Sequence, residues 1–216
     1  MTCGLRVRQG KTVNRAISTC APVLVLLGCA PTGPKDPFLV VSDGQLAPNM
    51  ALGVDSSTHK HDWVATNNAG KHIDVAYPSG ESWGLVQLKL GIDSEALQPA
   101  EDLSRFNTIQ LRLDGEWSEQ GGAIELGIQP RSDATDLPVA PKRVRLPTHA
   151  AGQGPTYYQV DLALFDRAGE TSPRKNLLSP ASFYFSGGCG SFLEIYEIAL
   201  FEDVPSCCAS LCTKDR

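Results

Sequence analysis

The sequence is short of positive charge: its 216 residues include 19 Lys and Arg against 24 Asp and Glu. Four of the basic residues and none of the acidic residues lie before Cys29, so subtracting the four from the 19 leaves 15 against 24 acidic side chains from Cys29 onward. These four are Arg6, Arg8, Lys11 and Arg15. A nucleic-acid binder needs clustered Lys and Arg to displace counterions from phosphates. The charge balance therefore argues against nucleic acid as a partner.

Long apolar runs and helical periodicity are also missing. The apolar stretch from Ala16 to Gly28 has 13 residues, whereas a helix that crosses a bilayer needs roughly 20. No segment keeps an apolar period of 3.6 residues over three turns. We therefore expect neither a transmembrane helix nor a helical domain.

Catalytic signatures are lacking as well. There is no nucleophile motif, phosphate loop or paired-carboxylate pattern, and Gly187-Gly188-Cys189-Gly190 has no helix pattern after it. His59-Lys60-His61-Asp62 holds possible zinc ligands, but no further ligand cluster is visible beside isolated His72 and His149. A solvated loop is the better interpretation of this fragment. We predict a protein that is not an enzyme and has no resident cofactor.

What the N-terminal segment does contain is the four basic residues, then the short apolar stretch, then Leu26-Leu27-Gly28-Cys29. This order resembles a bacterial lipoprotein signal peptide covering residues 1–28. The resemblance implies lipidation of Cys29, a proline-rich tether over residues 29–37, and a place in the cell envelope, at the outer membrane or cell surface. Two alternatives stay open, namely plain secretion with cleavage elsewhere and a buried N-terminal strand.

Residues 38–204 read as one all-β domain, because short alternating apolar runs are separated by turn residues. The central pair of runs lies between Asp102 and Gln129, where Ile109 and Leu111, then Ile124 and Leu126, alternate with polar side chains. About nine such strands suit a two-sheet β-sandwich or jelly roll. Weak alternation predicts loops for Asp43–Val64 and Arg131–Pro141. The other expected strands are Phe38–Val41, His72–Tyr77, Leu85–Leu90, Lys142–Leu146, Tyr157–Leu162, Ser182–Ser186 and Phe192–Phe201.

Four cysteines remain once those of the predicted signal peptide and Cys29 are set aside, and three of the four lie in a tail at residues 205–216. Four cysteines in an exported domain allow three disulfide pairings. Two adjacent tail cysteines are poorly placed to bridge each other, which favours a bond from the domain to the tail. Partly free thiols are the alternative. The candidates are Cys189, Cys207, Cys208 and Cys212.

Polar residues between the apolar positions suggest a binding surface. Sugar hydroxyls need amides, guanidinium groups and carboxylates, and the C–H face of a sugar stacks on aromatic rings. Trp117, beside a charged, glycine-containing turn, is the best of three tryptophans for stacking, although such a side chain can instead fold back over the core. An ordinary solvated face is the alternative for the strand positions. The predicted ligand-binding residues are Gln110, Arg112, Glu125, Gln129, Tyr157, Gln159, Tyr184 and Trp117.

Short motifs occur in a characteristic order: Val41-Ser42-Asp43-Gly44, Tyr77-Pro78-Ser79-Gly80 with Trp83, Asp102-Leu103-Ser104-Arg105-Phe106, Tyr158-Gln159-Val160-Asp161-Leu162 with Phe165, and Ile195-Tyr196-Glu197-Ile198-Ala199-Leu200. This order resembles the galactose-binding-like jelly rolls of carbohydrate-binding modules. The resemblance implies a carbohydrate partner and, in part of the family, a structural calcium ion. The family's closing Asp aligns with Tyr196, which leaves Asp43 and Glu197 as the oxygen ligands at family positions.

Together these features predict a lipid-anchored, non-catalytic protein that binds a polysaccharide or cell-wall glycan. The alternative is a structural or protein-interaction lipoprotein that uses the same sandwich without a sugar ligand. Exposed aromatic side chains on one sheet face would favour the first prediction, and a flat charged face would favour the second.

Overall fold

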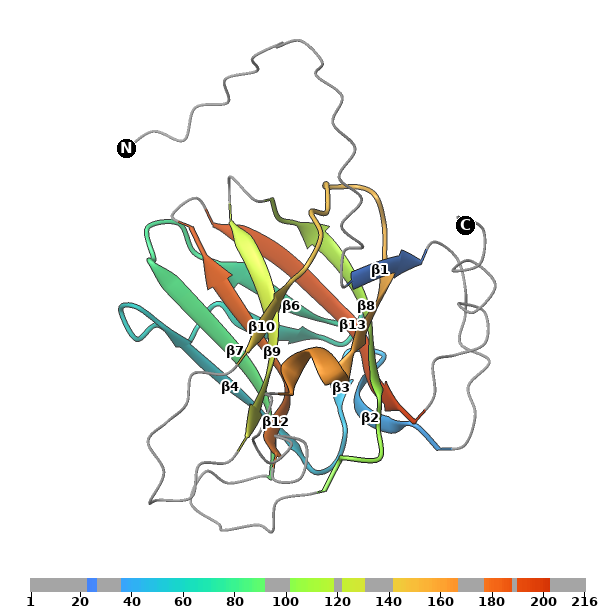
Figure 1. Cartoon of the computed structure of the whole chain (residues 1–216). Coiled ribbons are helices and arrows are strands. Elements are labelled where there is room, and N and C mark those ends of the chain that lie inside the picture. The colour runs from blue at the N-terminus through green and yellow to red at the C-terminus, as the bar shows by residue number, and fades with distance from the viewer. Residues whose placement is uncertain are drawn as a thin grey trace.

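The alternating runs fold into two antiparallel sheets that face each other, as the computed structural model of the chain shows (Figure 1). This confirms the prediction of an all-β, two-sheet β-sandwich. The structure describes residues 36–91, 102–118, 122–130, 142–166, 177–187 and 190–202, together with the backbone of residues 23–26.

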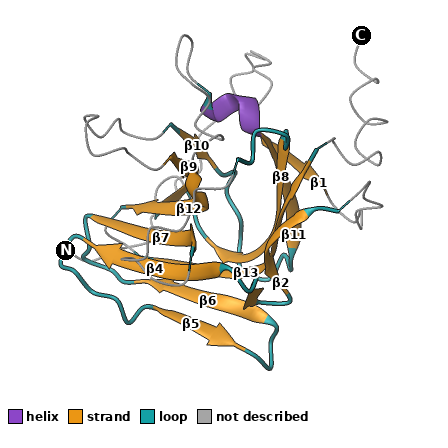
Figure 2. Ribbon diagram, turned by 90° about the horizontal axis from the view of Figure 1, so that it is seen from below, coloured by secondary structure: helices purple, strands orange, loops and turns teal. Residues whose placement is uncertain are grey.

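The larger sheet, called sheet A here, has eight strands in the order β1-β11-β8-β13-β2-β3, and β6 pairs with both β13 and β5. Figure 2 shows β5, β6 and β13 side by side in this sheet. Its strands are β1 (Val23–Leu26), β2 (Phe38–Ser42), β3 (Gln45–Leu46), β5 (Val64–Asn67), β6 (His72–Tyr77), β8 (Thr108–Glu116), β11 (Thr156–Asp161) and β13 (Ser191–Phe201).

The smaller sheet, sheet B, has five strands in the order β10-β9-β12-β7-β4. A short 3-10 helix, η1 (Leu162–Phe165), follows β11 and buries Leu162 and Phe165. The strands of sheet B are β4 (Met50–Ser56), β7 (Trp83–Leu90), β9 (Ala123–Pro130), β10 (Arg143–Arg145) and β12 (Leu177–Ser186).

The core lies between the two sheets and is built from the alternating positions. Successive side chains of a strand point to opposite faces, so one apolar set from each strand meets the facing sheet. The inward residues predicted for the central strands, among them Leu111 of β8 and Leu126 of β9, have no exposed surface, and neither has Phe183 of β12. The interpretation of these strands is confirmed, and it fixes which side chains point outward.

The neighbouring runs β8 and β9 belong to different sheets, β8 to sheet A and β9 to sheet B. The outward polar residues of these two strands therefore lie on opposite surfaces of the sandwich. Alternation predicts which face of a strand is polar, but it carries no information about which sheet the strand joins.

The prediction that residues 43–64 form a loop was wrong, because β3, β4 and the start of β5 lie there. In β4 all residues between Met50 and Ser56 are half-buried, so the side chains of this edge strand show little contrast between its two faces. The chain turns between β2 and β3 at Asp43 and Gly44, whose φ angles are 48° and 70°. Two left-handed residues form the tight turn that hairpins favour, and an Asp-Gly pair supplies them.

Several predictions fall outside the described residues. They concern lipidation of Cys29, the loop at 131–141, the cysteine-rich tail, and the four candidate disulfide cysteines. The apolar stretch of the predicted signal peptide is described in part, since Val23–Leu26 forms β1 and pairs with β11. No helix within the described ranges is both long and apolar enough to span a membrane.

Candidate functional site

An irregularity in the central strand of sheet A shapes its outer face. The ladder between β13 and β8 pairs Ile195 with Leu113 and then Glu197 with Arg112, so Tyr196 is an extra residue, a β-bulge. Ile195 and Ile198 are both fully buried. Because the bulge breaks strict alternation, Tyr196 and Glu197 can both lie on the outer face. The carbonyl of Tyr196 accepts a hydrogen bond of 3.0 Å from the Gly44 N–H.

An arginine lies between two tyrosines on this face. Arg112 and Tyr157 are directly opposite each other on β8 and β11, and the guanidinium carbon lies 6.0 Å from the Tyr157 ring centroid. The same carbon is 5.1 Å from the ring centroid of Tyr196. Such distances suit cation–π contacts, which hold the guanidinium plane in place. Three neighbouring strands thus present one cation and two aromatic rings side by side.

Two amide side chains lie next to this group, two residues further along the same two strands. Gln110 and Gln159 are directly opposite each other and are only 2% and 6% exposed. Within the described structure, Gln110 Oε1 and Gln159 Nε2 have no hydrogen-bond partner. Buried polar groups without partners are rare in proteins, and each needs an explanation such as an ordered water, an ion or a functional role. An acceptor and a donor without partners among the described residues therefore lie buried beside this group.

Carboxylates follow at the other side of Arg112. Glu194 of β13 lies directly opposite Asp74 of β6 and Asp114 of β8. Asp114 Oδ1 is 3.0 Å from His149 Nε2, and the other ring nitrogen of His149 is 2.9 Å from the Tyr158 hydroxyl. His149 is thereby fixed between a half-buried carboxylate and a buried tyrosine hydroxyl, which is a structural role.

Burial keeps the tyrosine hydroxyls of this face protonated. The pKa of Tyr196 is raised to about 12 by burial and by its hydrogen bond to Glu194. The pKa of Tyr157 is raised by burial and by the nearby charge of Glu197, with Arg112 acting in the opposite sense. Both hydroxyls are therefore protonated at neutral pH: that of Tyr196 donates to Glu194 Oε2 at 2.6 Å, and that of Tyr157 can act as a hydrogen-bond donor.

The polar residues predicted on β9 and β12 gather on the outer face of sheet B, where they contact one another. Tyr184 lies opposite Glu125, and the guanidinium carbon of Arg143 is 3.8 Å from the Tyr184 ring centroid. Arg143 also pairs with Glu125 at 3.8 Å. The Gln87 amide donates a hydrogen bond to Gln129. This second face leaves few groups for a ligand, because its polar side chains already have partners.

Trp117 contradicts the prediction of a ligand-stacking residue. It is 3% exposed, its ring stacks on His149 with centroids 4.8 Å apart, and its Nε1 donates to the Pro147 carbonyl at 2.8 Å. Both ends of the side chain are thus engaged inside the protein. The alternative prediction, that this tryptophan folds back over the core, describes its position.

The two predicted calcium ligands lie near each other on sheet A. Burial raises the pKa of Glu197, and the charge of Asp43 raises it further, while Arg112 lowers it. Asp43 is exposed and lies 4.0 Å from the ammonium group of Lys71. Among the described residues, Asp43 and Glu197 belong to no group of three possible metal ligands, so a calcium site here stays a prediction.

Comparison with known proteins finds likeness of fold. No family model and no curated protein sequence matches the chain. A family 11 carbohydrate-binding module from Clostridium thermocellum, solved with a β-1,3-1,4-mixed-linked tetrasaccharide, has a TM-score of 0.47 and 12% identity over 76% of this chain and 95% of its own. A family 30 carbohydrate-binding module has a TM-score of 0.48 and 12% identity over 77% of this chain and 99% of its own. The potassium-bound Emp46p carbohydrate recognition domain has a TM-score of 0.44 and 9% identity over 77% of this chain and 97% of its own.

Sequence reasoning found half of the candidate site. It placed Gln110, Arg112, Tyr157 and Gln159 on one polar face, and the register of β8 and β11 brings these four together. It missed Tyr196 because the bulge shifts that residue relative to the pattern. It also treated His72 as isolated, although the alternation of β6 puts His72 and Asp74 on one face. The signal that was missing is the pairing of β6 with β13.

Proposed function

We propose that the outer face of sheet A binds a saccharide. The observation that supports this most directly is the position of Arg112 between the rings of Tyr157 and Tyr196, beside two unpartnered amides. Turned toward solvent, the two amides would match the hydroxyl groups of a sugar, each of which donates and accepts. The outer face of sheet B has similar residue types, but these side chains contact one another, so fewer of them can bind a ligand.

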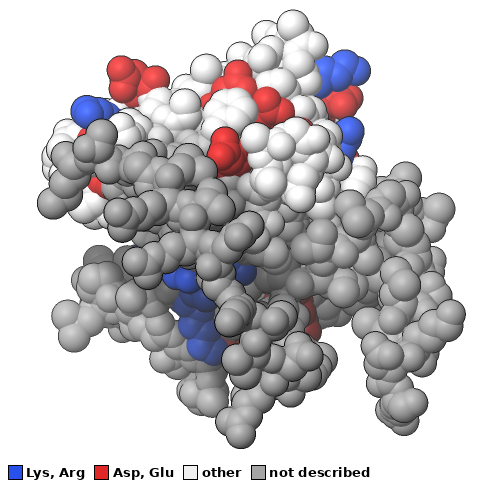
Figure 3. Space-filling view, turned by 90° about the horizontal axis from the view of Figure 1, so that it is seen from above, with Lys and Arg blue, Asp and Glu red and all other residues white. Residues whose placement is uncertain are grey.

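The chemistry favours a neutral glycan. Arg112 contributes several donors in a rigid planar group, while the tyrosine rings can contact the C–H face of a sugar. The surrounding carboxylates, Glu194 and Glu197, accept hydrogen bonds and would repel an anionic polymer. Figure 3 shows one face of the molecule, on which described Lys and Arg side chains form separate small groups among the carboxylates. We infer that the ligand is a neutral polysaccharide or oligosaccharide.

A matched pair of variants tests this proposal. Arg112→Ala and Tyr157→Ala should abolish retention on any neutral polysaccharide that retains the wild-type protein, for example in affinity electrophoresis. Arg143→Ala and Tyr184→Ala remove the same type of arginine–tyrosine pair from sheet B and should leave retention unchanged. Because surface substitutions usually change stability by less than about 0.5 kcal/mol, the variants should stay folded.

Two results would refute the proposal. One is retention lost equally in the sheet A and sheet B variants, because then the face is not specific. The other is a wild-type protein that no neutral glycan retains, in which case the alternative of a protein-interaction module is favoured.

We further propose that the domain is attached to a membrane through Cys29. The support is the order of basic residues, apolar stretch and Leu26-Leu27-Gly28-Cys29 in the sequence. Each buried methylene of a lipid chain contributes about 0.8 kcal/mol, and stable anchoring needs more than one chain. An anchored module would hold its glycan close to the membrane surface.

A further inference from the structure

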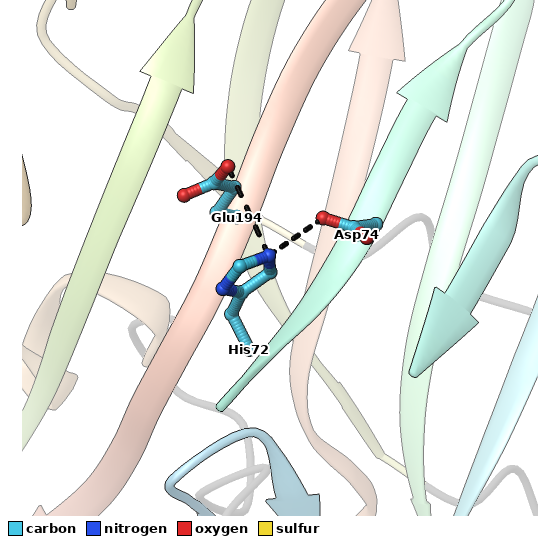
Figure 4. A group of neighbouring side chains, drawn as sticks. All are labelled: His72, Asp74 and Glu194. Atoms are coloured by element: carbon cyan, nitrogen blue, oxygen red, sulfur yellow. Dashed lines mark ion pairs between the residues drawn. The ribbon is translucent and has the colours of Figure 1, made fainter. Parts of the chain in front are cut away.

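We propose that His72, Asp74 and Glu194 form a binding site for a divalent transition-metal ion such as zinc. His72 and Asp74 come from β6 and Glu194 from the neighbouring strand β13, and their side chains point toward one another (Figure 4). One possible ligand atom of each residue lies within 4.8 Å of the others. The proposal concerns a second site on sheet A and does not depend on sugar binding.

The orientation of the imidazole is the first argument. His72 Nδ1 lies 2.9 Å from the carbonyl oxygen of Gly70. A carbonyl can only accept, so Nδ1 donates this hydrogen bond, and in a neutral ring Nε2 then carries a lone pair. Nε2 faces Asp74 Oδ1 at 2.9 Å and Glu194 Oε1 at 3.9 Å. Three electron-pair donors therefore converge on one point, as the ligands of a cation do.

The distances between these atoms suit a common ion. Nitrogen and oxygen ligands lie about 2.0–2.2 Å from zinc, so two ligands of one ion are at most roughly 4.4 Å apart by these bond lengths. The separations of 2.9 and 3.9 Å from Nε2 fall within this limit. The Asn67 amide nitrogen also approaches, at 3.2 Å from Nε2 and 3.3 Å from Asp74 Oδ2. A single amide cannot neutralise two carboxylates.

Groups outside the three ligands hold two of them in position. A metal-binding histidine typically donates its second ring nitrogen to a carbonyl or carboxylate, and His72 does so to Gly70. Glu194 Oε2 accepts a 2.6 Å hydrogen bond from the Tyr196 hydroxyl, which leaves Oε1 toward His72. A Cβ on Gly70 would lie 2.2 Å from His72 Cε1, so the position of the ring requires glycine there.

The excess of negative charge around these residues also favours a bound cation. Asp74, Glu194 and Asp114 lie side by side on three neighbouring strands, and like charges directly opposite each other destabilise a sheet. Among the described residues, the only basic side chains within 4.0 Å of these three carboxylates are those of His72 and His149. A bound divalent cation would offset the repulsion between Asp74 and Glu194.

The ligand types select the kind of ion. Imidazole with carboxylates suits zinc and neighbouring transition metals, whereas calcium prefers oxygen ligands alone. The side chains of His72, Asp74 and Glu194 are 10%, 32% and 20% exposed, so an ion can enter from solvent. Three protein ligands leave a fourth tetrahedral position for water or another oxygen ligand.

Zinc titration of the full-length chain tests the site. After treatment with a chelator, the protein is titrated with Zn²⁺ alone and the heat of binding is measured. Asp74→Asn and Glu194→Gln preserve shape and remove a charged ligand, and each should weaken zinc binding at this site by at least about tenfold, since loss of outer-shell partners alone costs about 10–100-fold. Gly70→Ala should weaken it as well, because the imidazole must move.

The control is His59→Gln. His59 forms an exposed pair with Asp55 at 3.1 Å and belongs to no group of three ligands among the described residues, so zinc affinity should not change. The proposal is overturned if the wild type binds zinc no more tightly than Asp74→Asn and Glu194→Gln, or if His59→Gln weakens binding as much. Circular dichroism of each variant verifies that it is folded, and Glu194→Gln provides a second test if Asp74→Asn does not fold.

Discussion

Replacing Gln110 with methionine should stabilise the protein while removing part of the proposed sugar site. Gln110 lies on β8 with 2% of its surface exposed, and its amide oxygen has no partner in the described structure. Methionine has a similar length and shape but no amide. The substitution therefore removes a buried acceptor without opening a cavity.

The size of the effect follows from the cost of burial. A buried polar group without a hydrogen bond costs about 1–3 kcal/mol, so the free energy of unfolding of Gln110→Met should rise by about this amount. For a domain of 150–250 residues, 1 kcal/mol corresponds to about 2–4 °C in melting temperature. Glycan retention should fall in the same variant, because an acceptor for sugar hydroxyls is lost.

Urea denaturation of wild type and variant gives the difference in unfolding free energy. The matched control is Gln87→Met on sheet B, where the amide donates to Gln129. Breaking that hydrogen bond should leave stability unchanged or lower it. An unfolding free energy of Gln110→Met equal to or below that of the wild type would refute the reasoning, because it would mean that ordered water already satisfies the amide.

Three further predictions concern the core, the acid stability and the anchor. Leu111→Ala should lower the unfolding free energy by roughly 2–5 kcal/mol through a cavity, and a loss under about 0.5 kcal/mol would place Leu111 at the surface. Hydrogen bonds from Ser57 and Thr58 lower the pKa of Glu81 from 4.5 to about 2. The contribution of Glu81 to the free energy of unfolding is therefore present above pH 4.5 and is lost as the pH falls toward 2. Acid titration of Glu81→Gln should show a smaller decrease in stability over that range than acid titration of the wild type. Cys29→Ser should move the protein from the membrane fraction to the soluble fraction, and unchanged sedimentation with membranes would contradict lipidation at this cysteine.

Much of the fold could be predicted from alternation alone. The central strands were placed correctly because Ile109, Leu111, Ile124 and Leu126 are apolar at every second position, and burial on one face of a sheet requires that spacing. The edge strand β4 was missed because its half-buried positions need no such contrast. Local pattern therefore identifies the strands that form the core more reliably than the strands at the edge.

The candidate site was predicted only in part, for a different reason. Which outward residues meet depends on pairing between strands that are far apart in sequence. Arg112 and Tyr157 are neighbours because β8 pairs with β11, and Glu125 lies on the other surface because β9 joins sheet B. The grouping of His72 with Glu194 depends likewise on the ladder between β6 and β13. Such pairings follow from the whole topology, which no single segment encodes.

The bulge at Tyr196 also has a consequence for which changes in chain length this domain can tolerate. Pairing of β13 passes from β6 to β2 around this residue, between Ile195 and Ile198. Deleting one residue here would leave a single residue between Ile195 and Ile198, so a regular ladder could form with both isoleucines still in the core, whereas a deletion within either half of β13 would turn part of the strand over. Deletion scanning along the chain should therefore find β13 tolerant of losing one residue at the bulge and less tolerant of single-residue losses within either half of the strand.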